Sequence, residues 1–299
     1  MKSNIDCVVI GAGIAGMTAA IYLKRANVNV LLLDKSAPGG QLNKISRIDN
    51  YPGFSTISGP DLATNLFEQI NSLNIEYRYG NVIDVENNDD YKIVTTETER
   101  ITTSSVIIAT GRQPKKLGLK KEEELVSRGI SYCALCDGMF FKDKIVATVG
   151  SGNGALNEAI YLSDICKEVI MINKKDTFDG DESIIEKVKN IKNIKIIYNS
   201  NVTQFNSKDD ILESIIINDK DKLDVSGVFI YTGLEPTNDF LKKLPIKFEK
   251  QYIVVDENMQ TSIEKIYACG DIVKKSVYQL TTAASDGTIA AINVKKNLK

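Results

Sequence analysis

The glycine pattern from Gly11 to Gly16, Gly-x-Gly-x-x-Gly, constrains the fold of this chain more than any other feature. An apolar segment, Ile5 to Ile10, precedes the pattern, and an alanine-rich segment, Ile14 to Ala26, follows its first glycines. A second apolar segment, Val28 to Leu33, ends next to an acid, Asp34. Strand, glycine turn, helix and strand in this order predict a β-α-β unit that opens a parallel sheet.

The three glycines have distinct expected functions in dinucleotide binding. Gly11 permits a tight turn, Gly13 lets the backbone approach a pyrophosphate, and Gly16 allows the helix to pack closely on the strand. The N-terminus of the helix would face the phosphate charge, and Asp34 would accept hydrogen bonds from a ribose. A purely structural turn is the alternative interpretation, but the strand, helix and acid around the pattern together favour a bound dinucleotide.

The same order of elements returns in the middle of the chain. Residues 144–149 are apolar, and Gly150-Ser151-Gly152 forms a second glycine turn. A helical segment to about residue 165 and an apolar segment, Glu168 to Ile172, follow this turn. Internal duplication of this kind predicts two domains rather than one long sheet.

Two apolar segments that end in glycine mark where the chain passes between the domains. Residues 107–111 are Ile-Ile-Ala-Thr-Gly, and residues 229–233 repeat the pattern as Phe-Ile-Tyr-Thr-Gly. The rest of the chain is too short for a third α/β domain, so we expect it to return and complete the first. The predicted fold class is α/β, with two Rossmann-like nucleotide-binding domains, the second inserted into the first. The expected bounds are 1–112 with 233–299 for the first domain and 113–232 for the central domain.

Composition and charge exclude several classes of function. With 37 Lys and Arg against 39 Asp and Glu, the chain lacks the basic field typical of proteins that bind nucleic acid or anionic membranes. Histidine is absent, which excludes Ser-His-Asp hydrolysis and most zinc hydrolase sites. The uncharged run from Cys7 to Leu23 resembles a signal peptide or a membrane span, but the phosphate-binding turn explains it. We therefore expect a cytoplasmic protein with no nucleic-acid or membrane partner.

Two of the five cysteines, Cys133 and Cys136, form a Cys-x-x-Cys pair. Such a pair can be a redox disulfide, half of a zinc site or two inert thiols. Zinc would need two further ligands, and the chain has neither histidine nor a second Cys-x-x-Cys, so we predict a reversible disulfide and no metal site. The nearest candidate acid is Asp137, which could also act as a helix N-cap. The other cysteines are interpreted as small buried hydrophobic residues: Cys7, Cys166 and Cys269.

Several further landmarks occur in a fixed order along the chain. They are Pro-Gly-Gly-Gln-Leu at 38–42, Asp-Asn-Tyr-Pro-Gly at 49–53, Ala-Thr-Gly at 109–111, Cys-Ala-Leu-Cys-Asp-Gly at 133–138, Ala-Cys-Gly-Asp at 268–271, and Gln279. With these landmarks the chain resembles the low-molecular-weight, bacterial-type thioredoxin reductases, collinearly from about residue 5 to residue 290. The resemblance implies that the two domains are of the FAD/NAD(P) type and that the first domain binds FAD.

The resemblance also implies positions around the cofactor. Gly40 and Gln41 would lie beside the flavin, Asn50 near the isoalloxazine and Gln279 close to the ring. Asp271 would bind the ribitol, although it could also be a simple turn residue after a strand. The full FAD-binding set implied by the resemblance is Gly11, Gly13, Ala15, Gly16, Asp34, Lys35, Gly40, Gln41, Leu42, Asn50, Val82, Ala109, Thr110, Gly111, Gly270, Asp271, Gln279 and Leu280.

The resemblance assigns unequal functions to the cysteine pair. Cys136 would lie by the flavin and receive its electrons, Cys133 would attack the disulfide of thioredoxin, and Asp137 would donate the proton. A homodimer is also implied.

One segment departs from the pattern of NADPH-dependent relatives. After the strand that ends at Ile172, these relatives carry His-Arg-Arg-x-x-x-Arg, which binds the 2′-phosphate. Here the corresponding residues are Asn173, Lys174, Lys175 and Asp179. Lysine lacks the bidentate fork of arginine, and the aspartate reverses the charge. NADH is not favoured either, because the ribose-binding carboxylate expected at the strand end is an asparagine.

A branch of the same family takes electrons from reduced ferredoxin, and this chain looks similar to that branch. We therefore expect reduced ferredoxin as the electron donor, with NADPH or NADH as the alternative. Ferredoxins are usually acidic, so a docking face should be basic. Lysine pairs at 115–116, 120–121, 174–175 and 274–275 are candidates, although such pairs are more often plain surface. Two other functions stay open: a ferredoxin/flavodoxin-NADP reductase, which needs no dithiol, and a flavin-bound redox sensor.

Overall fold

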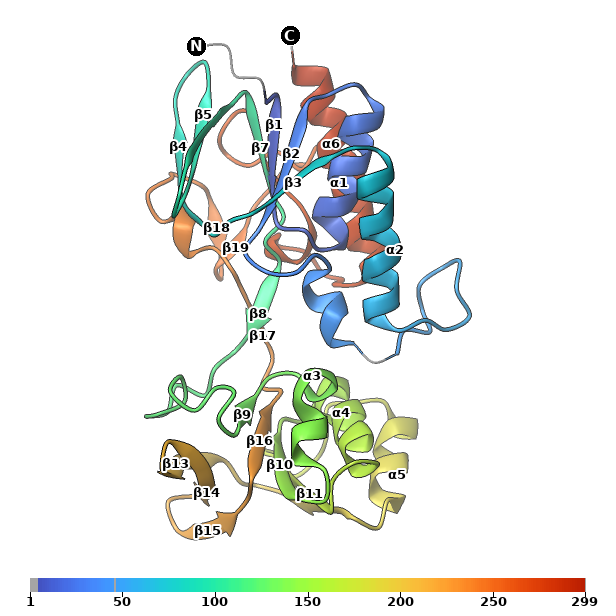
Figure 1. Ribbon diagram of the computed structural model, residues 1–299, viewed down its shortest axis with the longest axis vertical. Coiled ribbons are helices and arrows are strands. Elements are labelled where there is room, and N and C mark those ends of the chain that lie inside the picture. Colours follow the sequence, from blue (N-terminus) through green and yellow to red (C-terminus); the bar gives the residue numbers. More distant parts are fainter. Residues whose placement is uncertain (1–4, 46, 299) are drawn as a thin grey trace. The chain divides into compact units, whose positions relative to one another are not determined.

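The computed structural model describes residues 5–45 and 47–298, and the chain divides into two compact units. Unit 1 comprises Met1–Gln113 and Pro236–Lys299, and unit 2 comprises Pro114–Glu235. Each unit is built on a five-stranded parallel sheet (Figure 1). The predicted α/β fold class, in which the second domain is inserted into the first, is confirmed.

The sheet of unit 1 has the strand order β20-β7-β1-β2-β3. Its strands are β1 (Cys7–Ile10), β2 (Val30–Asp34), β3 (Glu76–Tyr79), β7 (Ser105–Ile108) and β20 (Ile266–Ala268). Three helices cover one face of this sheet: α1 (Ile14–Arg25), α2 (Gly59–Ser72) and α6 (Leu280–Asn297). The succession of β1, α1 and β2 is the β-α-β unit that the glycine pattern predicts.

Alternate residues of β1 belong to two different hydrophobic cores. Cys7 and Val9 pack with the helices, whereas Val8 and Ile10 pack with a three-stranded antiparallel sheet on the other face. Because successive side chains of a strand point to opposite faces and both faces are covered, β1 is apolar throughout. The remaining elements of unit 1 are β4 (Val82–Asn87), β5 (Lys92–Thr96), β6 (Arg100–Thr103), η1 (Gly40–Lys44), η3 (Asp239–Leu241), β18 (Phe248–Glu249), β19 (Tyr252–Ile253) and η4 (Gly270–Ile272).

The sheet of unit 2 has the order β12-β11-β10-β16-β9. Its strands are β9 (Ile130–Ser131), β10 (Ile145–Val149), β11 (Glu168–Ile172), β12 (Ile194–Ile197) and β16 (Gly227–Ile230). The helices of this unit are α3 (Ala134–Asp137), η2 (Gly138–Phe141), α4 (Asn153–Ser163) and α5 (Glu182–Asn190). An antiparallel sheet of β13 (Val202–Lys208), β14 (Ile211–Ile217) and β15 (Asp221–Asp224) completes it.

The two segments that connect the units run side by side. They form a two-stranded sheet of β8 (Arg112–Pro114) and β17 (Leu234–Pro236). Backbone hydrogen bonds flank this pair, from Lys115 N to Gly233 O at 3.0 Å and from Thr237 N to Gly111 O at 3.1 Å. Among the described residues, no helix combines the length and the apolar character needed to cross a bilayer.

Candidate functional site

The first glycine turn follows β1 at the carboxyl edge of the unit 1 sheet. Gly11 has φ 107°, and a Cβ there would lie 2.4 Å from the carbonyl oxygen of Ala109. A Cβ on Gly16 would lie 1.8 Å from the carbonyl oxygen of Gly11, whereas one on Gly13 would meet nothing within 4 Å. Helix α1 starts after Gly13 with no side-chain cap on its first N–H groups. The turn is therefore closed toward the protein and open where a phosphate would approach.

The acid after β2 is tied to this glycine turn. Asp34 Oδ2 accepts a hydrogen bond from Ala12 N at 2.6 Å, and Oδ1 accepts two from Ser36, from N at 2.8 Å and from Oγ at 2.9 Å. The next residue, Lys35, is exposed. The Asp34 carboxylate thus lies against the turn, at the position from which the Rossmann acid reaches a ribose.

The short helix η1 brings a second group of predicted residues to the same turn. A Cβ on Gly40 would lie 3.4 Å from Gly13 Cα, and Leu42 is buried. Gln41 Nε2 donates a hydrogen bond to the carbonyl oxygen of Arg112 at 2.7 Å. Gly40 therefore lies beside the glycine turn, and Gln41 reaches the start of β8.

The segment Ala109–Gly111 directly follows β7, and Ala109 lies beside Gly11. Thr110 Oγ1 donates a hydrogen bond to the carbonyl oxygen of Thr237 at 2.7 Å, which ties the segment to the returning chain. Gly111 has φ 62°, and a Cβ there would meet nothing within 4 Å.

The C-terminal landmarks Gly270, Asp271 and Gln279 also contact predicted cofactor-binding residues or their neighbours. Gly270 lies so close to α1 that a Cβ would come within 2.8 Å of Ala15 Cβ. Asp271 pairs with Arg112 at 2.7 Å. Gln279 Oε1 accepts a hydrogen bond from Asn50 Nδ2 at 3.2 Å, across 229 residues of sequence. Two residues predicted near the flavin ring are thus in contact.

Leu280 and Val82 are the last two predicted cofactor residues. Leu280 is the first residue of α6 and follows Gln279 directly. Val82 begins β4 and is buried in the core on the opposite face of the sheet from α1. The Val82 side chain is therefore occupied in packing, which leaves only its backbone to face a ligand.

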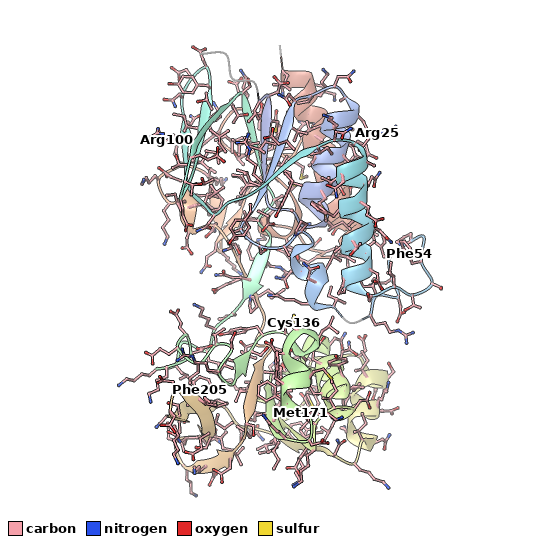
Figure 2. All side chains as sticks on the ribbon, in the orientation of Figure 1. Arg25, Phe54, Arg100, Cys136, Met171 and Phe205 are labelled. Carbon is pink, nitrogen blue, oxygen red and sulfur yellow. A yellow bond between two sulfur atoms is a disulfide. The ribbon has the colours of Figure 1, made fainter. Side chains whose placement is uncertain are left out.

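The cysteine pair is a disulfide in unit 2, between β9 and η2 (Figure 2). Cys133 caps helix α3, and its Sγ accepts a hydrogen bond from Cys136 N at 3.1 Å. Cys133 is only 6% exposed, whereas Cys136 is exposed. The N–H bond to Sγ would stabilise a thiolate on Cys133 after reduction.

Asp137 is held beside the disulfide by a residue that the sequence analysis missed. Ser131 Oγ donates a hydrogen bond to Asp137 Oδ2 at 2.6 Å. The same hydroxyl accepts from Cys133 N at 3.0 Å and lies 3.2 Å from the carbonyl oxygen of Cys133. The Asp137 carboxyl is therefore fixed to the backbone of the cysteine it would serve. Asp137 also occupies the N-cap position of η2, as its alternative interpretation predicts, but its side chain makes no capping hydrogen bond there; the N-cap of α3 is Cys133.

A second acid, Glu158 of α4, lies buried near the pair. It is 8% exposed, and among the described residues no donor reaches its Oε2. Burial raises the pKa of Glu158 to about 7. Burial and the Glu158 charge both raise the pKa of Tyr231, whose hydroxyl accepts a hydrogen bond from Ala134 N at 2.8 Å. Nothing in the sequence distinguishes this glutamate from an exposed helical one.

Replacing Glu158 with glutamine should make the protein more stable at high pH. The pKa of Glu158 is raised from 4.5 to about 7, so its contribution to stability is present below pH 4.5 and is lost as the pH rises through 7. Glu158→Gln should therefore gain about 3 kcal/mol in the free energy of unfolding at pH 8.5 relative to the unmodified protein, and little at pH 4.5. Urea unfolding at both pH values measures this difference. The exposed Glu186 on α5 supplies the control, since Glu186→Gln should change neither value.

The second glycine turn, after β10, keeps an open side. A Cβ on Gly150 would lie 2.4 Å from the carbonyl oxygen of Tyr231 and 3.0 Å from Ala155 Cβ. Gly152 and Gly154 face open space, and Gly152 gives α4 no side-chain cap. By itself this turn could receive a phosphate.

The loop after β11, residues 173–179, lies against that turn. Asn173 is fully buried, and its side chain holds the loop by donating to the carbonyl oxygen of Thr177 at 2.8 Å and accepting from Lys175 N at 3.0 Å. Asp179 N donates to the carbonyl oxygen of Ser151 at 2.8 Å. The amide of Asn173 is thus occupied within the protein and does not replace a ribose-binding carboxylate.

The Asp179 side chain adds a negative charge beside the second glycine turn. Asp179 Oδ1 pairs with Lys175 Nζ at 2.7 Å, and Oδ2 accepts from Ser151 Oγ at 2.7 Å. Hydrogen bonds from Lys175 and then Ser151 lower the pKa of Asp179, so the group is ionised at neutral pH. Lys175, one of the two candidate phosphate ligands, is already paired with this acid.

The other three cysteines are free and buried, as their interpretation as hydrophobic residues requires. Burial raises the pKa of Cys166 to about 11, and it raises the pKa values of Cys7 and Cys269 further. Within residues 5–45 and 47–298, no group of three or more His, Cys, Asp or Glu side chains could hold a metal ion.

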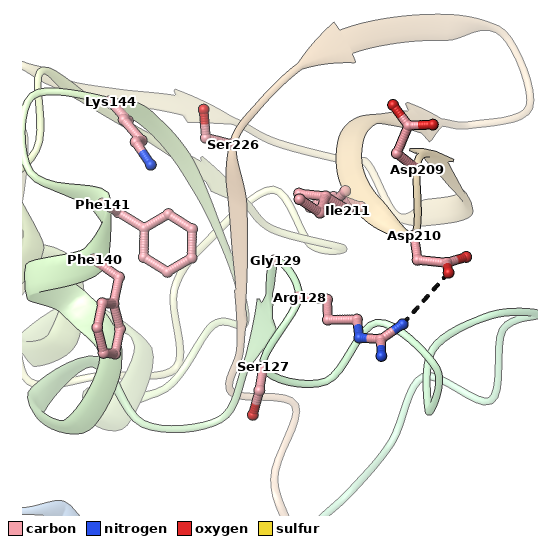
Figure 3. A pocket seen from close by; sticks show the side chains of 11 residues that line it. Ser127, Arg128, Gly129, Phe140, Phe141, Lys144, Asp209, Asp210, Ile211 and Ser226 are labelled. Carbon is pink, nitrogen blue, oxygen red and sulfur yellow. Dashed lines mark ion pairs between the residues drawn. The ribbon is translucent and has the colours of Figure 1, made fainter.

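A surface cavity of about 630 Å³ lies in unit 2 (Figure 3). Phe140 and Phe141 line it from η2, and two further lining residues, Arg128 and Asp210, form an ion pair at 3.6 Å. Phe140 is 74% exposed and follows Cys136 closely in the sequence. Charged and polar side chains, among them Lys144, Asp209 and Ser226, also line the cavity.

The fold and the site together define a class of protein. It combines two glycine turns that could each receive a phosphate with a Cys-x-x-Cys disulfide. The family model for pyridine nucleotide-disulphide oxidoreductases matches residues 5–287, and the chain belongs to this family. Within the family it stands with the bacterial-type thioredoxin reductases, as its landmarks predict, and these enzymes bind FAD. The predicted cofactor, FAD, is thereby confirmed. The open glycine turn at Gly11–Gly16, with the uncapped N-terminus of α1 behind it, fits the phosphates of this cofactor.

Named relatives are similar over nearly their whole length. The thioredoxin reductase of Ureaplasma parvum is 40% identical over 296 residues, which cover 97% of this chain and 96% of that protein. The thioredoxin reductase of Bacillus subtilis is 36% identical over 295 residues, covering 97% of this chain and 93% of that protein. The crystal structure of Lactococcus lactis thioredoxin reductase has a TM-score of 0.92 and 38% identity, with 98% of both chains covered.

A ferredoxin-flavin thioredoxin reductase from Clostridium acetobutylicum is a more distant relative. Its crystal structure has a TM-score of 0.56 and 28% identity, covering 99% of this chain and 97% of that chain. Overall similarity therefore does not support the prediction that this chain stands closest to the ferredoxin-dependent branch.

Proposed function

We propose that this thioredoxin reductase takes its electrons from reduced ferredoxin and delivers them to thioredoxin through the Cys133–Cys136 pair. Two electrons and two protons would convert the Cys133–Cys136 disulfide into two thiols. The two thiols would then pass these electrons and protons to thioredoxin, whose own disulfide is reduced while the Cys133–Cys136 disulfide re-forms. FAD, when bound, supplies the exchange between a one-electron donor and two-electron dithiol chemistry. Cys136 would receive the electrons, Cys133 would attack thioredoxin, and Asp137 would supply the proton.

The observation that carries the donor proposal is the ionised Asp179 beside the second glycine turn. Asp179 neutralises Lys175, which would otherwise be available to a 2′-phosphate, and its hydrogen bond to Ser151 places negative charge next to the turn. A nicotinamide dinucleotide would bring its own phosphates to the same place, and like charges repel. A protein donor that docks on the surface avoids this repulsion.

A pyridine nucleotide is the second candidate donor, and one observation favours it. Gly152 and Gly154 leave the second turn open, and the helix N-terminus behind it has no side-chain cap. Lys174 is exposed and could contact a phosphate. NADPH or NADH would then bind without the arginine clasp and with reduced affinity.

We further propose that residues 1–112 and 233–299 form the FAD-binding domain and that residues 113–232 form the central, nucleotide-binding-like domain. The cofactor-binding set of the first domain is the one described above. We also propose a cytoplasmic homodimer, because the resemblance implies a dimer and free thiols suit a reducing compartment.

Anaerobic mixing with each donor in turn tests the proposal. Millimolar NADPH or NADH should fail to bleach the flavin within minutes, whereas reduced ferredoxin should bleach it quickly, at a rate that falls as salt rises. Adding thioredoxin should then give sustained turnover, which separates a reductase from a redox sensor. Rapid bleaching by micromolar NADPH would refute the ferredoxin assignment.

Two charge reversals in the same loop sharpen this test. Asp179→Arg frees Lys175 and Ser151 and should give a measurable response to NADPH. Asp176→Arg changes an exposed acid of the loop by the same charge and serves as the control, which should stay unresponsive. An equal gain in both variants would mean that the net charge of the loop matters rather than the contact with the glycine turn.

A further inference from the structure

Arg112 is outside the predicted cofactor set, yet two members of that set hold it. Gln41 Nε2 donates to the Arg112 carbonyl oxygen at 2.7 Å. Arg112 Nε and Nη2 donate to Asp271 Oδ2 at 3.1 and 2.7 Å. The partners lie 71 and 159 residues away in the sequence, and all three residues belong to unit 1. The backbone and the side chain of Arg112 are thus fixed by residues predicted to lie beside the flavin and its ribitol.

An aromatic ring fixes the guanidinium group from a third direction. The guanidinium carbon of Arg112 lies 4.3 Å from the centroid of the Tyr278 ring. Tyr278 directly precedes Gln279, whose side chain bonds Asn50. A planar guanidinium stacked on a ring and bonded to a carboxylate has little freedom to move. Its charge therefore has a defined position among the residues predicted to surround the flavin.

The geometry of the Arg112–Asp271 ion pair leaves one carboxylate oxygen of Asp271 available to a ligand. Both hydrogen bonds from Arg112 reach Oδ2 of Asp271, so Oδ1 receives neither of them. Arg112 and Asp271 side chains are 17% and 25% exposed, which leaves the pair partly screened but still accessible. An aspartate held in this way can accept a hydroxyl of a cofactor through Oδ1 while the arginine compensates its charge.

A second charged pair also lies near the Tyr278 ring. Lys275 Nζ is 5.7 Å from the centroid of the Tyr278 ring and pairs with Asp286 at 2.7 Å. Asp286 Oδ2 also accepts from Gly270 N at 3.1 Å, so this pair holds the backbone before Asp271. Lys275 is committed to a buried acid, whereas Arg112 is paired with the acid that faces the proposed cofactor site.

We propose that Arg112 is a cofactor-site residue that orients Asp271 and places a fixed positive charge beside the flavin. The proposal rests on the assignment of the FAD site in unit 1. A fixed cation favours the reduced cofactor over the oxidised one, because reduction adds negative charge to the ring system. Arg112 thereby sets both the affinity for FAD and the ease with which the bound flavin is reduced.

Arg112→Gln tests the proposal without measuring turnover. We expect the dissociation constant of FAD from the apoprotein, measured by flavin fluorescence, to rise about tenfold, the usual cost of a charged hydrogen bond. The reduced form should lose about ten times more affinity than the oxidised form, which lowers the midpoint potential by about 30 mV for a two-electron couple. Dye equilibration measures this shift.

Three further variants separate charge from structure. Arg112→Lys keeps the positive charge, so the midpoint potential of the bound flavin should stay close to that of the unmodified protein. The double variant Arg112→Gln with Asp271→Asn removes both charges, so it should unfold like the unmodified protein but still bind FAD weakly. Arg100→Gln removes an arginine paired with Glu86 on the surface of unit 1 and should change nothing.

The failures are distinguishable. Unchanged FAD affinity and potential in Arg112→Gln would overturn the proposal while leaving the FAD site intact. Failure of the unmodified apoprotein to rebind FAD would refute the cofactor site itself, and with it the proposed function.

Discussion

Changing either cysteine of the pair to serine should lower thioredoxin-dependent turnover by at least about 10³-fold, because no other thiol can take its place. The remaining cysteines are buried, and burial holds their pKa values above the ordinary range, so they stay protonated thiols. Steady-state turnover with thioredoxin measures the loss. Cys166→Ser is the matched control and should retain full activity.

The two serine variants should differ in the complex that they trap. A thioredoxin with a single cysteine, blocked as a mixed disulfide with 5-thio-2-nitrobenzoate, is the probe. Cys136→Ser keeps the peptide N–H that stabilises the Cys133 thiolate, so Cys133 should attack the probe, release the coloured thiolate and remain linked to thioredoxin. Cys133→Ser should give no such complex on a non-reducing gel.

The opposite result has a structural meaning. Cys136 is the exposed member of the pair and Cys133 the buried one. Trapping by Cys133→Ser alone would show that accessibility decides which sulfur attacks, and it would reverse the proposed functions of the two cysteines.

Asp137→Asn should slow reduction of the disulfide of thioredoxin by about 10²-fold or more, the usual contribution of a positioned acid. Asp137 is fixed beside Cys133 by Ser131, and the chain has no histidine to replace it. Single-turnover mixing of the reduced protein with thioredoxin measures the rate, and the FAD content should stay unchanged.

Asp143→Asn is the control for this experiment. Asp143 is exposed and lies in the same unit, with a φ of 59° that asparagine also tolerates. It should react at the rate of the unmodified protein. Full activity in Asp137→Asn would mean that solvent supplies the proton.

The sequence predicted the parts of the site that depend on short-range geometry. The positive φ of Gly11 and its contact with Ala109 follow from the needs of a tight turn after a strand, which the glycine pattern records. The strand Glu168–Ile172 has the bounds that its apolar run predicts. Family landmarks added Gln279 and Asn50, which the structure brings into contact although 229 residues separate them.

Other parts of the site depend on contacts that leave no local signal. Arg112 follows the Ala-Thr-Gly landmark directly, but its importance lies in partners 71 and 159 residues away. The burial of Glu158 results from packing around α4, and an isolated helical glutamate does not reveal it. The sequence shows the charge reversal at Asp179, but the hydrogen bond from Ser151 to Asp179 depends on how the loop packs against the glycine turn.

The pairing of β8 with β17 has a consequence for how the two units divide the proposed sites. The chain leaves unit 1 and returns to it through two neighbouring strands, and β7, before the insertion, pairs with β20, after it, in the sheet of unit 1. Unit 2 is therefore inserted into unit 1 through two chain ends that pair with each other. The loop at 173–179, on which the donor proposal rests, belongs wholly to this inserted unit and shares no residue with the proposed flavin site of unit 1.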